Sequence, residues 1–306
     1  MWIANNGTGT STLFLGDGTP APSPATPLVV TIPSPTAGGT AAPTGLVTNA
    51  TTGFVVSANG KSGASLFIFA TEDGTIAGWS PAVDLHNAIL AVNNSGSGAV
   101  YKGLATGVSS GKSFLYATNF HDGVVEMYNS SFGFVKSFTD PTVPAGFAPF
   151  GIQNIKGDLY VTFALQNEEK HDDVSGPGNG FIDVFATDGT WKFRFASNGV
   201  LNSPWGLALA PPGFGRFAGK LLVGDFGDGR INAFVFPGGG PSDGTLKDTL
   251  GLPLTINGLW GLKFASGGPS GHKNHLLFTA GIGDESHGLF GFIRPADAED
   301  QHDETE

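Results

Sequence analysis

Polar turns that carry histidine recur along this chain, and they hold the residues best suited to chemistry. Each turn separates two apolar runs, with a glycine inside or beside it. Carboxylate and amide oxygens bind Ca²⁺ or Mg²⁺, whereas histidine combined with carboxylates favours Zn²⁺ or another transition metal. The turn residues are Asn5 and Asn6; Glu72 and Asp73; Asn119, His121 and Asp122; His171, Asp172 and Asp173; Asp225 and Asp228; and Asp284, Glu285 and His287.

A site built from these turns would hold a divalent cation (Ca, Mg or Zn) as a Lewis acid, while a nearby side chain moves a proton. The candidate catalytic residues are His287 and His121, because His287 follows a denser polar cluster than a turn requires. The candidate metal ligands are Asn119, Asp225, Asp284, Glu285 and His171.

Turn formation alone accounts for part of this pattern. Asp and Asn directly before Gly are common in tight hairpin turns, because they tolerate positive φ and bond their own backbone. Asp73, Asp122 and Asp228 fit that description. Asp225 and Asn119 end an apolar run instead, so turn chemistry does not explain them.

The elements that must position these turns are short strands in a repeat. A three-residue anchor with a central glycine occurs five times, at intervals of roughly 50 residues, which is the length of a propeller blade. After each anchor come an apolar run, a polar turn and a second apolar run, the pattern of a β-hairpin. The anchors are Thr44-Gly45-Leu46, Lys102-Gly103-Leu104, Phe150-Gly151-Ile152, Trp205-Gly206-Leu207 and Trp260-Gly261-Leu262.

Five anchors, together with six hairpins of which the first opens the chain, predict an all-β, six-bladed β-propeller in a single domain over residues 1–295. We expect an acidic, disordered tail at 296–306 and outer strands at 27–32, 134–138, 190–195 and 248–254. The first and last blades should have about three strands each, as in an N-terminal truncation of a longer protein. The predicted blades are 1–34, 35–95, 96–143, 144–198, 199–254 and 255–295.

Composition limits the possible partners. The 48 Gly and 20 Pro, with only 13% charged residues, favour short strands and tight turns over helices. A net charge of −11 repels phosphate backbones and anionic lipids, so nucleic acid and membrane surfaces are poor partners. No apolar run reaches about 18 residues, which argues against membrane insertion. The absence of cysteine excludes disulfides and thiolate metal sites.

Four stretches, WIANNGTGTSTL (2–13), NSPWGLALA (202–210), GDGRINAF (227–234) and HGLFG (287–291), resemble a known family. It is the family of uncharacterised, NHL-like six-bladed propellers of bacteria, often exported and sometimes carrying a PEP-CTERM sorting signal. The resemblance implies a six-bladed propeller and an extracellular or periplasmic location, and it implies no reaction. The first residues of the chain show no signal-peptide pattern.

Three classes of function remain open. In a propeller the hairpin turns converge at one mouth of the central channel, where ligand sites usually lie. The first class is an exported propeller that binds a small ligand, a cation or a protein partner there. The second is a metal-dependent, lactonase-like hydrolase or lyase acting at the same mouth. The third, a purely structural repeat, leaves the polar turns unexplained. Whether the protein is an enzyme stays open.

Overall fold

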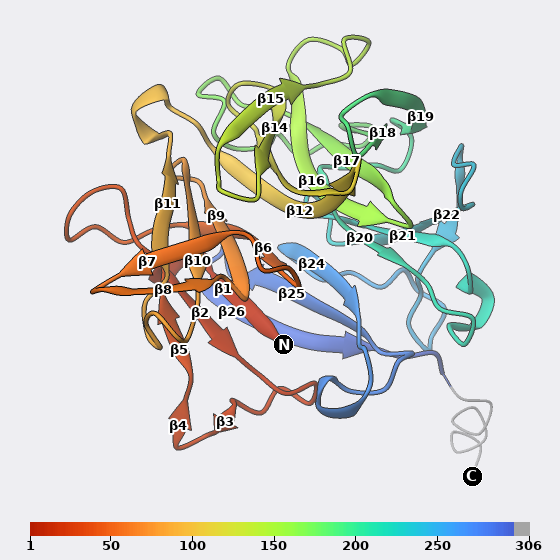
Figure 1. Ribbon diagram of the computed structural model, residues 1–306. Helices are drawn as coiled ribbons and strands as arrows, with labels where there is room; N and C mark the ends of the chain where they lie inside the picture. Colours follow the sequence, from red (N-terminus) through yellow and green to blue (C-terminus); the bar gives the residue numbers. More distant parts are fainter. Residues whose placement is uncertain (297–306) are drawn as a thin grey trace.

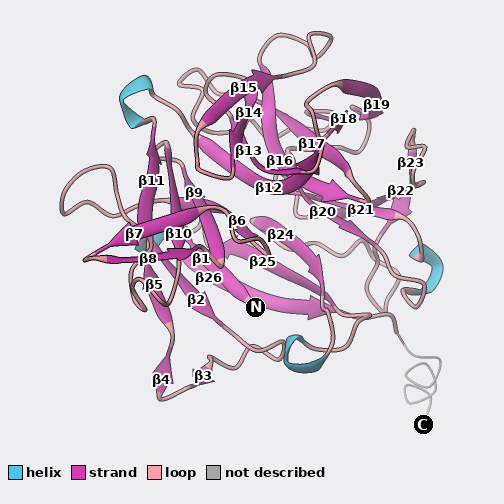
Figure 2. Ribbon diagram, viewed as in Figure 1, coloured by secondary structure: helices cyan, strands magenta, loops and turns pink. Residues whose placement is uncertain are grey.

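Six antiparallel sheets surround one axis in the computed structural model, which describes residues 1–296 (Figures 1 and 2). The sheets follow one another along the chain, which confirms the all-β, six-bladed propeller. Four of the blades have four strands. These are β6 (Pro43–Thr48), β9 (Phe67–Thr71), β10 (Thr75–Trp79) and β11 (Ile89–Asn93); β12 (Tyr101–Ser109), β13 (Lys112–Asn119), β14 (Val124–Asn129) and β15 (Phe134–Phe138); β16 (Phe147–Ile155), β17 (Asp158–Leu165), β18 (Gly180–Ala186) and β19 (Trp191–Ser197); and β20 (Pro204–Leu209), β21 (Leu221–Asp225), β22 (Ile231–Phe234) and β23 (Ser242–Thr245).

Blades 1 and 6 have three strands each in the described part of the chain, as predicted. Blade 1 supplies a hairpin and an outer strand, and blade 6 supplies an inner strand and a hairpin. Loops join the two blades: the Gly16 amide donates to the Pro269 carbonyl at 2.9 Å, and the Phe14 and Phe290 rings lie 6.0 Å apart. The strands are β1 (Trp2–Asn5), β2 (Thr10–Leu13) and β5 (Val29–Thr31), then β24 (Leu259–Phe264), β25 (Leu276–Ile282) and β26 (His287–Ile293).

The anchor glycines let the blades approach one another at the axis. All five lie on the first strand of their blade, and each first strand from β6 to β20 contacts the first strand of the next blade. A methyl group on Gly103 would lie 3.0 Å from the Phe150 carbonyl oxygen, and one on Gly206 would lie 2.6 Å from the Trp260 carbonyl oxygen. Only glycine leaves room for this backbone approach, so the predicted equivalence of the anchors is confirmed.

Apolar clusters fill the spaces between neighbouring blades. Phe69 and Trp79 of blade 2 pack with Val30 of blade 1, and similar clusters join blades 2 to 3, 3 to 4, 4 to 5 and 5 to 6. This face-to-face packing fixes the tilt of each sheet and thereby the place of its turns.

Two elements differ from the expectation. The outer strand of blade 5 is β23, not 248–254, because Asp248 folds that segment into a turn by accepting the amides of Leu250 and Leu252 at 3.0 and 2.9 Å. Blade 2 also carries an unexpected hairpin, β7 (Val55–Ala58) with β8 (Lys61–Ala64), and the first blade's loop holds the short pair β3 (Pro22–Ser23) and β4 (Thr26–Pro27). Apart from residue 296, the predicted tail lies outside the described residues.

The helical elements of residues 1–296 are 3₁₀ turns, and none is long and apolar enough to cross a bilayer.

Candidate functional site

Aromatic side chains occupy the axis of the propeller. The Trp260 ring lies 5.5 Å from Trp205, 5.8 Å from Phe150 and 4.5 Å from Phe226. Phe150 belongs to blade 4 and Trp260 to blade 6, so their contact passes blade 5 and must cross the centre of the ring. Phe150, Trp205 and Trp260, each the residue before an anchor glycine, therefore point inward and form a hydrophobic floor with Phe226.

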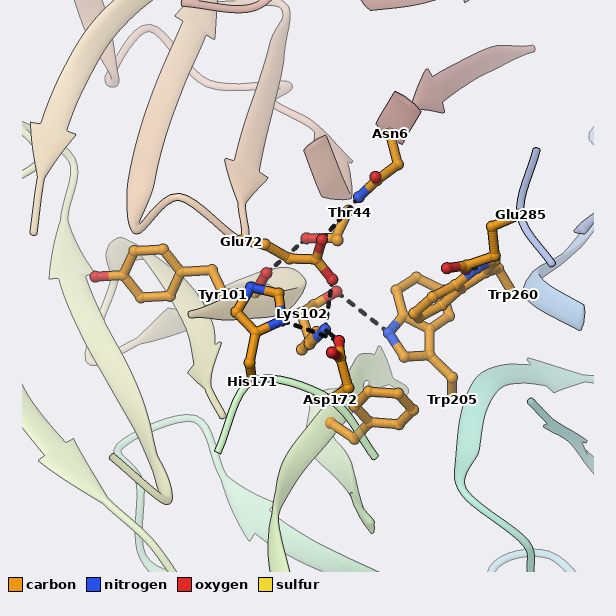
Figure 3. A network of polar contacts seen from close by, with 12 residues as sticks. Asn6, Thr44, Glu72, Tyr101, Lys102, His171, Asp172, Trp205, Trp260 and Glu285 are labelled. Carbon is orange, nitrogen blue, oxygen red and sulfur yellow. Dashed lines mark hydrogen bonds and ion pairs between the residues drawn. The ribbon is translucent and has the colours of Figure 1, made fainter. Parts of the chain in front are cut away.

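One lysine stands in this aromatic setting. Lys102, the residue before Gly103, is 3% exposed, and its ammonium pairs with Glu72 and, at 3.3 Å, with Asp172 (Figure 3). Asn6 donates its amide to the second Glu72 oxygen at 2.9 Å. A buried ammonium needs such partners because desolvation of an unpaired charge is costly.

The network continues to the far side of the axis. The Trp205 indole donates to the Lys102 carbonyl at 3.2 Å, and the Trp260 indole donates to Glu285 at 2.9 Å. His171 Nδ1 lies 3.0 Å from Asp172. Figure 3 shows these side chains turned toward one another. Every one of the six blades contributes to this connected set, which we call the axial network: Asn6, Glu72, Lys102, His171, Asp172, Trp205, Trp260 and Glu285.

The carboxyl groups of the axial network differ in acidity. Burial raises the pKa of Glu285, and the carboxylates of Glu72 and Asp172 act in the same direction, while the Trp260 indole and the Lys102 ammonium oppose them. Burial would also raise the pKa of Asp172, but the Lys102 ammonium and the His171 imidazole bring it below its ordinary value. Glu285 thus ionises less readily than Asp172.

A buried hydroxyl lies beside this network. Ser203 is fully buried, and its Oγ has no hydrogen-bond partner among the described residues. Burial raises the pKa of Asp173, and the neighbouring Ser203 hydroxyl and the Lys102 ammonium partly oppose that shift. The Ser203 hydroxyl therefore faces the Asp173 carboxyl without completing a well-formed bond.

The six predicted turns lie at one end of the propeller, because each connects the second and third strands of a blade, or the equivalent strands of blade 1. We call this end the turn face. Glu285 and His171, both predicted metal ligands, join the axial network.

Two other predicted ligands are enclosed in their own turns. Asn119 is fully buried and donates to Asp122 and Glu126, both at 2.9 Å. Asp225 is also fully buried, and it accepts the Asn202 amide at 3.1 Å and the Asn232 side chain at 2.7 Å. Burial raises the pKa of Asp225 well above its ordinary value. These contacts stabilise the hairpins, and they explain why Asn119 and Asp225 end their strands although neither residue forms the turn itself.

The remaining predicted residues lie on the turn face outside the axial network. His121 is half-buried and pairs through Nδ1 with Asp122 at 3.0 Å. His287 is exposed and bonds Ser286 at 2.8 Å, and Asp284 is exposed on the same turn. Within residues 1–296, no group of three or more His, Asp or Glu residues is arranged to hold a metal ion.

Lys102 is the central residue that the sequence interpretation missed. Its partners lie 30 and 70 positions away along the chain, so no local motif connects them. A signal was nevertheless present: the residues before the other anchor glycines are threonine, phenylalanine and tryptophan, and Lys102 is the one charged residue among the five.

Comparison with curated proteins finds relatives in Acanthamoeba polyphaga mimivirus. One uncharacterised protein of that virus is 37% identical over 221 residues, covering 70% of this chain and 40% of the relative. A second is 33% identical over 261 residues, covering 82% of this chain and 62% of the relative. The chain thus spans less than two thirds of the length of these relatives. They give no support to the bacterial origin or the sorting signal implied by the resemblance, and no protein-family model matches the chain.

Among solved structures, virginiamycin B lyase from Staphylococcus aureus superimposes with a TM-score of 0.56 at 15% identity, over 96% of this chain and 76% of the lyase. A putative gluconolactonase matches with a TM-score of 0.49 at 17% identity, over 75% of this chain and 74% of that protein. At these identities the likeness concerns the fold alone.

Proposed function

We propose that this protein binds a small polar ligand on the turn face, over the axial network. The observation that carries the proposal is that one connected set of side chains takes a member from each of the six blades and centres on a buried lysine. Aromatic surface combined with a few convergent polar groups is the usual make-up of a ligand site.

Stability alone does not require this arrangement. Replacing a buried ion pair with well-packed apolar side chains is often neutral or stabilising, so a lysine in an aromatic floor is weak evidence for a structural role. Three of the other anchors fill their equivalent positions with phenylalanine or tryptophan. Lys102 therefore departs from the packing solution that the fold uses elsewhere, as residues at functional sites do.

Tryptophan emission reports directly on the proposed site. Trp205 and Trp260 both belong to the axial network, so a bound ligand should change their fluorescence. The experiment titrates the purified protein with a chemically diverse set of small cations, sugars and carboxylic acids, in parallel with the W205F and W260F variants. We expect a saturable change that is reduced in one or both variants. A protein whose emission and melting temperature respond to none of these compounds would contradict the proposal.

A hydrolase or lyase acting at the same place is the second candidate. The observation that favours it is the Glu285 carboxyl, whose pKa burial raises, on a network that also holds the His171 imidazole, because a carboxyl that keeps its proton more tightly than usual can serve as a general acid. The fold neighbour with the higher TM-score, virginiamycin B lyase, is by name an enzyme of that kind. Turnover of a lactone or cyclic ester that is lost in E285Q, with the fold retained, would favour this candidate over simple binding.

The proposal has three further parts. The protein binds a divalent cation at the turn face, it is exported from the cell, and a protein partner binds at the turn face. Metal analysis of the purified protein, fractionation of the producing cells and affinity capture with the turn face intact or substituted would test them in turn.

A further inference from the structure

The charges of the axial network are unequal. The Lys102 ammonium contacts Glu72 and Asp172, so one positive charge already faces two carboxylates. The polar contact of Glu285 in the structure is the neutral Trp260 indole. One ammonium against three carboxylates leaves an excess of negative charge on the turn face.

Unused hydrogen-bonding capacity in the network is mainly acceptor capacity. Among contacts within residues 1–296, Oε2 of Glu285, Oδ2 of Asp172 and the side-chain oxygen of Asn6 have no donor. The indole donors of Trp205 and Trp260 are already engaged. A complementary ligand must therefore bring N–H or O–H donors, positive charge, or both.

The aromatic members fit a cation better than an anion. Trp260 is half-buried, and its indole N–H bonds Glu285 beside it. The face of a tryptophan ring attracts cations through its quadrupole, and organic ammonium ions are the usual guests of such aromatic surfaces. The Lys102 ammonium is paired with Glu72 and Asp172, which reduces its repulsion of a bound cation.

We infer that the ligand of the axial network is a small organic cation, an alkylated or protonated amine that contacts Oε2 of Glu285 and the accessible part of the Trp260 ring. This inference rests on the proposed function. An organic cation is preferred to a metal ion, because the described residues hold no group of three or more His, Asp or Glu side chains suited to a metal.

The test uses choline, tetramethylammonium and agmatine as probes, with 3,3-dimethylbutan-1-ol as the neutral isostere of choline. Binding is followed by calorimetry and tryptophan emission at low salt and pH 7.5. We expect at least one cation to bind at least about tenfold more tightly than the neutral isostere, and E285Q to weaken that binding at least about tenfold. E169Q, in an exposed glutamate on the inserted loop, should leave the affinity unchanged.

Two variants separate the ring face from the indole N–H. W260F keeps an aromatic face and should retain most of the affinity, whereas W260L should lose it. Thermal melts establish that each variant is folded.

The failures are distinguishable. Tight binding of a neutral or anionic compound, a quench by Ca²⁺ that EDTA reverses, or an E285Q variant that binds the cation normally would overturn this inference and leave the proposed site standing. Failure of all three cations, with a sugar or acid from the diverse set still bound, overturns it as well. If no compound of any class binds, the proposed function itself fails.

Discussion

The Gly206 Cα lies so close to Trp260 of the next blade that a methyl group added to it would sit 2.6 Å from the Trp260 carbonyl oxygen. Because the neighbour is backbone, it cannot rotate away as a side chain would. The same relationship links the anchors of blades 3 and 4, where Gly103 faces the Phe150 carbonyl.

G206A should therefore lower the free energy of unfolding by about 2 to 3 kcal/mol, the cost of overpacking a site that cannot relax. Urea denaturation measures the change. G288A is the matched control, since Gly288 also lies in a strand but a methyl there would meet nothing within 4 Å. Equal stability of G206A and G288A would contradict the packing role of the anchors.

Removing the buried ammonium should destabilise the protein by about 3 kcal/mol in K102M, because Glu72, only 14% exposed, is left without its cation. The double variant E72Q/K102M should regain part of that loss. K192M serves as the control: Lys192 pairs with Asp158 at 2.7 Å, but both side chains are substantially exposed, so less than about 1 kcal/mol is expected. A double variant less stable than K102M would argue against the ion pair as the cause.

Asp183 should make stability fall as the pH rises. Burial raises its pKa to about 6 despite the hydrogen bond and the charge of Arg194, and one of its carboxylate oxygens has no partner among the described residues. Since the folded pKa exceeds the ordinary value of 3.8, the folded state holds a proton that the unfolded state releases between those two values. Its contribution is complete below pH 3.8 and is lost by about pH 6, with a slope of at most about 1.4 kcal/mol per pH unit.

The check for Asp183 is the pH dependence of unfolding in wild type and D183N. The stability of D183N relative to wild type should increase from pH 4 to 7, whereas E169Q should follow wild type throughout. A constant difference between wild type and D183N across that range would refute the assignment.

Asp225 distinguishes a structural carboxyl from a metal ligand. D225N should cost about 1 to 3 kcal/mol, because the new amide faces the Asn232 amide that the carboxylate now accepts. The loss should be the same with and without EDTA, measured by thermal unfolding. If EDTA removes the difference between D225N and wild type, Asp225 holds a cation after all.

The fold was readable from the sequence because its determinants are local and repeated. The anchor glycines and the hairpin after each one lie within a single blade, so their spacing alone predicts blade number and strand order. The outer strand of blade 5 was placed wrongly because the hydrogen bonds of Asp248 to Leu250 and Leu252 turn the chain where apolar residues suggested a strand.

The site was readable only in part. Turn composition singled out Glu285 and His171, which lie in the axial network, and their predicted role as metal ligands stays a prediction. It could not show that Lys102 meets Glu72 and Asp172, because those contacts depend on three different blades being arranged around one axis. The sequence also does not reveal burial, so Asn119 and Asp225 looked available as metal ligands. In the structure both are buried: the Asn119 amide donates to Glu126 and the Asp225 carboxylate accepts from Asn232, and these bonds hold the hairpins.

The contacts across the axis bear on how this ring comes apart. In a linear repeat array each unit touches only its neighbours, and such arrays can melt from one end. Here Trp205 of blade 5 bonds Lys102 of blade 3, and Trp260 of blade 6 touches Phe150 of blade 4, so each contact passes over an intervening blade. Detaching any one of blades 3 to 6 therefore also breaks a contact with a blade that is not its neighbour. The propeller should consequently lose its structure in a single cooperative step, despite being assembled from repeats.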